Sequence, residues 1–260
     1  MRLALFQNDC HPGDPAGQLG ALARVARDWA GRADLLVTPE LFMTGYRIGA
    51  EATRHLAEPA SGPFADGVAA LARETGMAIL YGFPERDGAR LYNSAQVFDG
   101  AGQPLALYRK IHLPNDEERA IFTPGDRIVT FDLLAFRVAP LICYDVEFPE
   151  SVRACAAAGA DLVLAPTALR QHWRQIAEMM MPVRALESGV YLAYCNQAGV
   201  EADWAYAGLS CICAPDGSVL ARAGSGAEVI VATLERAAIS AARSRLPYRQ
   251  DGRFSLSGPN

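Results

Sequence analysis

The sequence predicts a single α/β domain in which helices cover sheets of several strands on both sides. Strand-like apolar runs alternate with longer stretches whose apolar residues recur at helical spacing. Residues 35–38 (LLVT) and 161–165 (DLVLA) are apolar without a clear alternation, which is typical of strands buried on both faces. The chain has 260 residues, 51% of them hydrophobic. Because no repeat or linker divides it, we expect one domain over residues 1–260.

The first half of the chain predicts two helices among strands. Residues 14–31 carry Leu19, Leu22, Val25 and Trp29 at helical spacing. A second helix over residues 64–75 ends at Gly76, because glycine adopts the left-handed conformation that closes a helix. Strands are expected at residues 2–7, 35–38, 77–83, 94–98 and 105–109, with a turn at residues 99–100.

The second half continues the alternation. One helix is expected at residues 149–158, with Pro149 in its first turn, and another at residues 172–188, ended by Gly189. Residues 243–260 are polar, and we expect a loop that lies along the surface or against a partner subunit. Further strands are expected at residues 128–132, 136–142, 161–165, 190–195, 208–214, 219–221 and 228–234.

Charge and composition argue against several classes of partner. The net charge is −5 and the pI is near 5.4, whereas a nucleic-acid-binding protein normally has a basic face. No apolar run reaches the roughly 20 residues that cross a bilayer. The N-terminal run LALF is too short for a signal peptide. We therefore expect a soluble, cytoplasmic enzyme without a nucleic-acid or membrane partner.

Six cysteines are present, at positions 10, 143, 155, 195, 211 and 213, and none forms a C-x-x-C pair. Cys211 and Cys213 are two residues apart, so on a strand they face the same side. Their apolar neighbours favour buried thiols over a zinc site. Without a secretion signal a disulfide framework is not expected.

Almost all of the basic residues are arginines. Of the 24 Lys and Arg residues, Lys110 is the only lysine, so the other 23 are arginines. On an exposed surface the two are close substitutes. In a site they are not, because lysine delivers a compact charge whereas arginine is a planar fork. The lone lysine therefore points to a task that arginine cannot perform; the alternatives are a chance survivor and an ordinary solvated residue at a strand end.

Cys143 and Glu40 each follow a buried strand. Cys143 lies in LICYDVEFPE, where a strand gives way to a helix and backbone N–H groups can hold an oxyanion. Glu40 follows residues 35–38 at the strand end where ligands bind in α/β proteins. Its apolar neighbours favour a raised carboxyl pKa, as a general base needs. A structural thiol and an ion-paired or capping carboxylate are the alternatives.

Four motifs occur in order along the chain: T-P-E-L-F with Glu40, Y-R-K-I-H-L with Lys110, E-E-R-A-I-F-T-P-G from Glu117, and C-Y-D-V-E-F-P-E from Cys143. Together they resemble the nitrilase superfamily of carbon–nitrogen hydrolases over nearly the whole chain. The resemblance implies a four-layer α-β-β-α sandwich, no metal or organic cofactor, and a homodimer or dimer-based oligomer.

The resemblance also implies a Glu–Lys–Cys triad at Glu40, Lys110 and Cys143. Glu40 would act as the acid and base, and Cys143 would form a thioester. Lys110 and the backbone N–H of Tyr144 would stabilise the oxyanion. A second glutamate, which orients the substrate and the lysine, falls on Glu118, with Glu117 as the fallback.

The motifs look most like those of bacterial amidases such as 5-aminopentanamidase and R-stereoselective amidases. We therefore expect hydrolysis of a small aliphatic carboxamide, an ω-amino one included, to a carboxylic acid and ammonia. Glu147 could receive a substrate ammonium group, as could Asp203 or Glu201, but Glu147 also fits an ion pair with an arginine such as Arg153. The aromatic residues that could shape an apolar pocket are Trp173, Trp204 and Tyr206.

Other functions stay open at this point. An N-carbamoyl amine or a nitrile could react at the same triad. A different cysteine hydrolase would use His112 or His172 as the base of a Cys–His pair. A non-catalytic interaction protein is a further alternative, although every expected catalytic position is intact.

Overall fold

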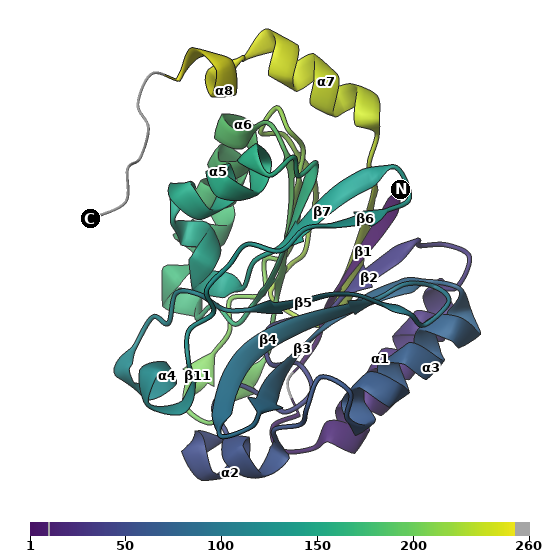
Figure 1. Cartoon of the computed structure of the whole chain (residues 1–260), viewed down its shortest axis with the longest axis vertical. Helices are drawn as coiled ribbons and strands as arrows, with labels where there is room; N and C mark the ends of the chain where they lie inside the picture. Colours follow the sequence, from purple (N-terminus) through teal and green to yellow (C-terminus); the bar gives the residue numbers. More distant parts are fainter. Residues whose placement is uncertain (10, 253–260) are drawn as a thin grey trace.

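The computed structural model describes residues 1–9 and 11–252 and contains two six-stranded sheets (Figure 1). The first sheet has the order β14-β1-β2-β3-β4-β5 and the second β13-β12-β9-β8-β7-β6. The strands of the first sheet are β1 (Arg2–Gln7), β2 (Leu35–Val37), β3 (Ala78–Asp87), β4 (Arg90–Phe98), β5 (Pro104–Arg109) and β14 (Glu228–Thr233). Those of the second are β6 (Phe131–Leu133), β7 (Phe136–Pro140), β8 (Leu162–Thr167), β9 (Tyr191–Asn196), β12 (Cys211–Cys213) and β13 (Val219–Arg222).

The two sheets are mixed. In the first, β1 pairs parallel with β2 and β2 with β3, while β1–β14, β3–β4 and β4–β5 are antiparallel. The parallel pairs of the second sheet are β7–β8 and β8–β9. A separate two-stranded hairpin is formed by β10 (Val200–Glu201) and β11 (Trp204–Ala205).

Helices cover the outer faces of the two sheets (Figure 1). On the first sheet lie α1 (Pro15–Trp29) and α3 (Pro63–Thr75), and on the second α5 (Pro149–Ala157) and α6 (Met181–Ser188). Two short helices, α2 (Gly49–Leu56) and α4 (Asp116–Ile121), lie near the β10–β11 hairpin in Figure 1. None of the helices in residues 1–9 and 11–252 has the length and apolarity needed to cross a membrane.

Side-chain alternation along β1 explains the layers. Leu3 and Leu5 lie in a core that also contains residues of β7, β8 and β9, so they pack between the two sheets. Ala4 and Phe6 face the opposite side, in a core with residues of α1 and α3. Because successive strand residues point to opposite faces, the first sheet is buried on both. The predicted α/β fold with a four-layer α-β-β-α sandwich is confirmed.

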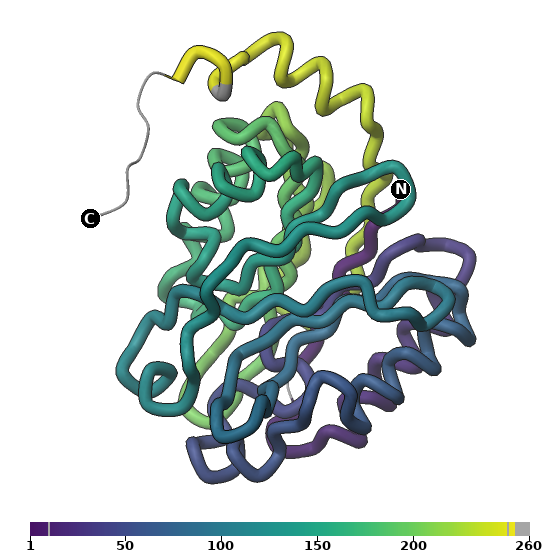
Figure 2. The backbone as a smooth tube through the Cα atoms, in the orientation of Figure 1, coloured from purple at the N-terminus to yellow at the C-terminus, as the bar shows by residue number. Residues whose placement is uncertain are grey.

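The first and the last strands of the described chain are neighbours in the first sheet. The first strand, β1, pairs over its whole length with β14 near the other end (Figure 2), and the Met1 amino group donates to the Leu234 carbonyl at 3.0 Å. After β14 the chain forms α7 (Arg236–Arg245) and α8 (Tyr248–Asp251). The expected loop over residues 243–260 is therefore wrong for residues 243–245 and 248–251, because the alanine-rich run before Arg245 favours a helix. Residues 253–260 lie outside the described part.

The expected single helix over residues 172–188 is also wrong. The structure has a 3-10 turn, η2 (Gln171–Trp173), a π-helical turn, η3 (Ile176–Met180), and then α6. Pro182 has no backbone N–H to donate to the preceding turn, which disfavours a regular α-helix at this point. The strand expected at residues 128–132 is shorter and begins at Phe131.

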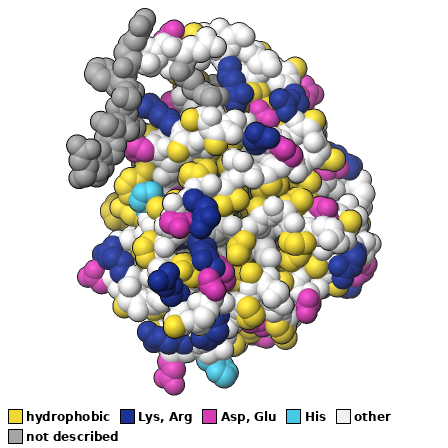
Figure 3. All heavy atoms as spheres, viewed as in Figure 1, with side chains coloured by type: hydrophobic (Ala, Val, Ile, Leu, Met, Phe, Trp, Pro, Cys, Tyr) yellow, Lys and Arg dark blue, Asp and Glu magenta, His cyan; other side chains and the backbone are white. Residues whose placement is uncertain are grey.

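Acidic and basic side chains are interspersed over the surface. On the face drawn in Figure 3, acidic groups lie beside many of the basic ones. The structure pairs Arg2 with Asp34, Arg27 with Glu74 and Arg137 with Asp132. Many arginines are therefore neutralised locally.

Candidate active site

Glu40 lies in the loop after β2, where the backbone is tightly constrained. Leu41 has a φ of 48°, in the left-handed region that non-glycine residues rarely adopt. A Cβ at Gly82, on β3, would lie 2.6 Å from the Pro39 oxygen and 2.7 Å from the Leu41 nitrogen, so this close approach requires glycine. The Gln197 amide donates to the Glu40 carbonyl at 2.9 Å. These contacts fix the position of Glu40.

Lys110 directly follows β5 and places its ammonium group between two carboxylates. Its Nζ donates to Glu40 Oε1 at 2.6 Å and to the two oxygens of Glu118 at 2.9 and 3.0 Å. The Asn93 amide also donates to Glu40 Oε1, at 2.8 Å. The side chains of Lys110 and Glu40 are both 0% exposed, so their charges interact more strongly than they would in water.

Burial and charge set the protonation states of the triad residues. Burial raises the pKa of the Glu40 carboxyl, while Lys110 opposes that shift. Burial alone would lower the pKa of Lys110, but the carboxylates of Glu118 and Glu40 raise it well above its ordinary value. Burial and the Glu40 carboxylate raise the pKa of the Cys143 thiol. At neutral pH Cys143 is therefore a thiol, and Lys110 is an ammonium.

The two oxygens of the Glu40 carboxylate have different surroundings. While Oε1 accepts from Lys110 and Asn93, Oε2 is buried and has no hydrogen-bond partner among the described residues. A buried carboxylate oxygen without a donor is costly, which raises its affinity for a proton. Glu40 is thus held by one oxygen and able to take or give a proton with the other.

Cys143 occupies a strained backbone position between β7 and α5. It is half-buried and begins a 3-10 turn, η1 (Cys143–Glu147), with a φ of 47°. The buried Asp145 holds this turn by accepting from the Ile142 N–H at 3.1 Å, the His112 N–H at 2.9 Å and the Tyr108 hydroxyl at 2.8 Å. Strain of this kind persists only where surrounding contacts enforce it, and it is common at functional sites.

Glu118, rather than Glu117, reaches the lysine. Asn115 caps α4 by accepting from the Glu118 N–H at 2.8 Å, which directs the buried Glu118 side chain to Lys110. The Tyr46 hydroxyl donates to the same Glu118 carboxylate. Glu117 lies at the surface and pairs with Arg47 at 2.9 Å.

The two histidines of the Cys–His alternative have other environments. The His112 ring contacts the Asp145 carboxylate through Nδ1 at 2.8 Å and stacks on Phe148 at 4.2 Å between ring centroids. His172 is exposed on η2, beside Trp173. Neither ring is hydrogen-bonded to Cys143 in the described contacts, whereas the Glu40 carboxylate lies near enough to add to the effect of burial in raising the pKa of the Cys143 thiol.

Glu147 ends the turn that begins with Cys143, and its carboxylate is not paired. Arg184 donates to the Glu147 backbone carbonyl at 2.6 Å and pairs with Glu187 at 2.9 Å. Arg153 also pairs with Glu187, at 3.3 Å. The alternative of a Glu147–arginine ion pair is therefore not formed among the described residues. Burial raises the pKa of Glu147 to about 7, against the opposing charges of Lys110 and Arg184.

The two tryptophans predicted to shape an apolar pocket have different surroundings. Trp173 is 50% exposed. Two guanidinium groups lie over the Trp204 ring, with Arg47 at 4.4 Å and Arg170 at 4.3 Å from its centroid. These cation–π contacts join Trp204 to Arg47 and Arg170, which lie outside the hairpin. Substrate contact by either tryptophan stays a prediction.

The other predicted substrate-binding residues, in and directly after the hairpin, already have hydrogen-bond or ion-pair partners. The Asp203 side chain is 71% exposed and pairs with Arg47 at 2.9 Å. Tyr206 is buried and donates to Glu201 at 2.5 Å. Glu201 is itself buried and accepts backbone donors, so its carboxylate is already occupied.

Four residues of the site were not assigned from the sequence: Tyr46, Asn93, Asp145 and Gln197. Asp145 stands inside the C-Y-D motif, which was the available signal. Tyr46 directly follows Gly45, whose φ of 92° marks a special turn. Asn93 and Gln197 come from elements far along the chain, so their contacts with Glu40 arise only on folding.

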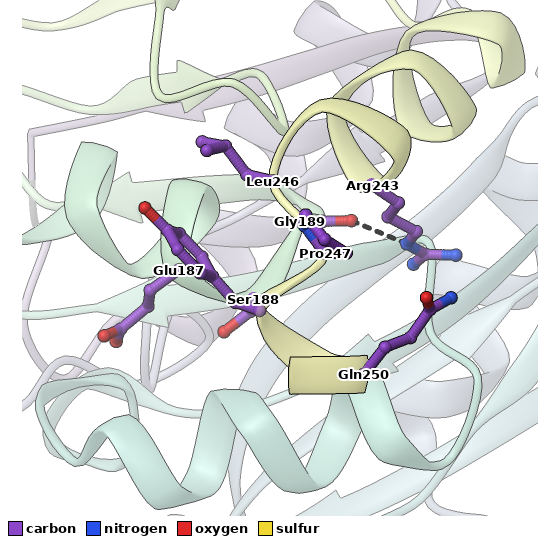
Figure 4. Close-up of a pocket in the computed structure, with 8 residues that line it drawn as sticks. Glu187, Ser188, Gly189, Arg243, Leu246, Pro247 and Gln250 are labelled. Carbon is purple, nitrogen blue, oxygen red and sulfur yellow. Dashed lines mark hydrogen bonds between the residues drawn. The ribbon is translucent and has the colours of Figure 1, made fainter. Parts of the chain in front are cut away.

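A separate surface pocket of about 270 Å³ lies between the end of α6 and the α7–α8 segment (Figure 4). Its lining includes Glu187, Gly189 and Arg243, and Arg243 donates to the Gly189 carbonyl at 2.9 Å. It contains no triad residue. Within residues 1–9 and 11–252, no group of three or more His, Cys, Asp or Glu side chains could hold a metal ion.

Comparisons with known proteins assign the chain to a family. The carbon–nitrogen hydrolase family model matches residues 2–244. A protein described as "Hydrolase in pqqF 5′region", from Pseudomonas protegens, is 44% identical over 98% of this chain and 90% of its own. An (R)-stereoselective amidase from Pseudomonas sp. is 34% identical over 99% of this chain and 93% of its own.

Solved structures share the fold. A double mutant of the amidase from Nesterenkonia sp. AN1, in complex with acrylamide, is 33% identical with a TM-score of 0.85, covering 97% of this chain and 94% of that one. Another structure of that amidase shows Michael addition of acrylamide at its active site cysteine. The chain therefore belongs to the carbon–nitrogen hydrolase family, within the nitrilase superfamily.

Proposed function

We propose that this protein is a cysteine-dependent amidase that hydrolyses a small aliphatic carboxamide to a carboxylic acid and ammonia. The observation that carries the proposal is the ammonium of Lys110, fully buried between Glu40 and Glu118 and close enough to Cys143 to affect the pKa of its thiol. An amide is a weak electrophile with a poor leaving group, so splitting its hydrolysis through a thioester lowers the barrier of each step.

In the first half-reaction, Cys143 Sγ attacks the amide carbon while Glu40 takes the thiol proton. The developing oxyanion lies against Lys110 and the Tyr144 N–H, a donor that has no acceptor within the first turn of η1. Collapse breaks the carbon–nitrogen bond, and Glu40 returns the proton to the nitrogen, which leaves as ammonia. Cys143 then carries the acyl group as a thioester.

In the second half-reaction, water replaces ammonia. Glu40 takes a proton from that water, whose oxygen attacks the thioester carbon. The same donors hold the second oxyanion, and collapse releases the acid while Glu40 returns the proton to the Cys143 sulfur. Glu118 keeps Lys110 in place throughout, since both its oxygens accept from Nζ.

Glu147 supports an ω-amino carboxamide as one form of the substrate. Its carboxylate is half-buried, makes no ion pair with a described residue, and lies near Lys110 and Cys143, since their charges affect one another's pKa values. A carboxylate in that position would bind a substrate ammonium group distal to the reacting amide. Without such a ligand, partial burial disfavours the charged form of this carboxyl, as its raised pKa shows.

The test is a release assay over matched substrates. Ammonia would be measured for primary aliphatic amides, their ω-amino counterparts, N-carbamoyl amines and nitriles, with carbon dioxide measured in parallel. The proposal expects ammonia and acid from the amides, with the ω-amino compounds preferred. Carbon dioxide from a carbamoyl amine, or conversion of nitriles alone, would instead assign one of the alternative functions.

We further propose that the enzyme is a cytoplasmic homodimer or dimer-based oligomer. Met179 and Val183 lie four residues apart on the η3–α6 segment and are 69% and 49% exposed. Apolar groups on one helical face are typical of an interface. A thiol nucleophile also suits a reducing compartment. Light scattering after size exclusion would measure the mass in solution, and a monomer would contradict the dimer.

A further inference from the structure

The β10–β11 hairpin approaches the catalytic lysine from a distant part of the chain. Figure 1 places β11 beside α4, the helix that carries Glu118. Arg47 links the two, since its guanidinium pairs with Glu117 on α4 at 2.9 Å and with Asp203 on the hairpin at 2.9 Å. The hairpin, the loop at residues 45–47 and α4 therefore form one contact region.

Glu201 is the buried centre of that region. It is 1% exposed. One carboxylate oxygen accepts from the Arg47 N–H at 2.8 Å. The other accepts from the Tyr46 N–H at 3.2 Å and the Tyr206 hydroxyl at 2.5 Å. All three donors are neutral groups, so Glu201 fixes a backbone segment instead of balancing a side-chain cation.

The loop is shaped to receive this carboxylate. Gly45 has a φ of 92°, a conformation that side-chain-bearing residues rarely adopt. A Cβ at Gly45 would lie 2.6 Å from Glu201 Oε1. The absence of a side chain therefore lets Glu201 reach the two N–H groups that follow.

Tyr46 transmits this placement to the active site. Its backbone is held by Glu201, its ring lies 5.5 Å from the Trp204 ring, and its hydroxyl donates to Glu118. The same Glu118 carboxylate accepts from Lys110 Nζ through both oxygens. Tyr46 therefore restricts where Glu118, and through it Lys110, can lie.

We propose that Glu201 is a positioning residue, which holds the Tyr46 hydroxyl on Glu118 and thereby fixes Lys110 for the oxyanion. Glu201 does not touch the reacting atoms. The inference rests on the proposed amidase function, because it assigns Lys110 a role in the reaction. It adds that the β10–β11 hairpin is part of the catalytic framework.

The test compares Glu201→Gln, Tyr46→Phe and the double variant, with Val200→Thr as the control. Gln keeps the size of Glu but points an N–H at backbone donors. Val200 is 64% exposed on the same strand, so its variant reports on general disturbance of the hairpin. Steady-state kinetics, thermal unfolding and the rate of Cys143 alkylation by iodoacetamide, followed by intact mass, would be measured for each.

We expect kcat to fall roughly 10- to 100-fold in each single variant, as small misplacements of catalytic groups do, with a smaller change in KM. Alkylation should slow in the same variants. The double variant should lose little more than the worse single one, because both changes act through Glu118. The control should keep its kcat.

Three results would overturn the inference: a wild-type kcat in Tyr46→Phe, a Glu201→Gln variant that loses thermal stability but not kcat, or losses that multiply in the double variant. Tyr46→Phe removes only a hydroxyl, so it tests the proposal even if Glu201→Gln does not fold. Wild-type protein that hydrolyses no amide would refute the proposed function instead, and the alkylation rates would still report on the positioning.

Discussion

Replacing Lys110 with arginine keeps the charge of the site and changes its geometry. The Lys110 ammonium is 0% exposed and makes three contacts of 2.6, 2.9 and 3.0 Å. Arginine still compensates Glu40 and Glu118, so the stability cost comes from overpacking, about 1–3 kcal/mol. Its planar head cannot place a donor at the same point. Losing one well-placed oxyanion donor lowers kcat by about 10²–10³, equivalent to about 3–4 kcal/mol.

The assay is ammonia release under saturating amide, with thermal unfolding recorded on the same samples. Arg109→Lys, the reverse exchange one residue earlier, is the matched control, because Arg109 pairs with Glu85 and Asp87 and not with the triad. Lys110→Met is less informative, since it leaves two buried carboxylates uncompensated at a cost of about 3–5 kcal/mol. A near-normal kcat in Lys110→Arg would refute the geometric role of the lysine.

Three further predictions follow from the site. Glu40→Gln removes the base and should lower kcat by about 10²–10⁴, whereas His112→Asn should lose far less; the reverse ranking would support a Cys–His pair. Because burial raises the pKa of Glu147 to about 7, its charged form is lost as the pH falls through neutrality. The KM for an ω-amino amide should therefore rise as the pH is lowered from 8 to 6, while the KM for a neutral isostere should not. Glu147→Gln should abolish this difference between the two substrates. Parallel pH profiles of KM in the wild type would show that Glu147 does not bind the substrate. In Gly82→Ala the added Cβ would lie 2.6 Å from the Pro39 oxygen. The free energy of unfolding should therefore fall by roughly 1–3 kcal/mol, and much of kcat should be lost. Unchanged unfolding and kcat would show that Gly82 does not fix the Glu40 loop.

Long, strongly patterned elements could be predicted from the sequence. The strand expected at residues 2–7 is β1, and the helix expected at residues 64–75 is α3 apart from one residue. Their apolar residues contact the core directly, so the pattern of burial is written into the local sequence. The order of the motifs likewise pointed to Glu40, Lys110 and Cys143.

Elements stabilised by distant contacts could not be predicted in this way. Helix α4 has six residues and no long apolar face; it depends on the Asn115 cap and on the contacts of Glu118. Strands β10 and β11 have two residues each, too few for a detectable period. Their position is set by Glu201 and the loop around Tyr46, far away in the sequence.

The choice between the two neighbouring glutamates shows the same limit. Glu117 and Glu118 are adjacent and chemically identical, so motif spacing ranked them without a physical reason. The cap at Asn115 sets the phase of the helix and directs Glu118 inward. The unpaired state of Glu147 was equally hidden, because it depends on Glu187 taking both nearby arginines.

The proposed mechanism requires Cys143 to carry the acyl group during turnover. Rapid quenching in acid during hydrolysis of a small primary amide, followed by peptide mass spectrometry, would measure it directly. The peptide containing Cys143 should gain the mass of the acyl group, and this adduct should decay at the rate of turnover. Cys143→Ala should show neither adduct nor ammonia. An enzyme that releases ammonia while Cys143 stays unmodified, or that keeps its activity in Cys143→Ala, would contradict this mechanism.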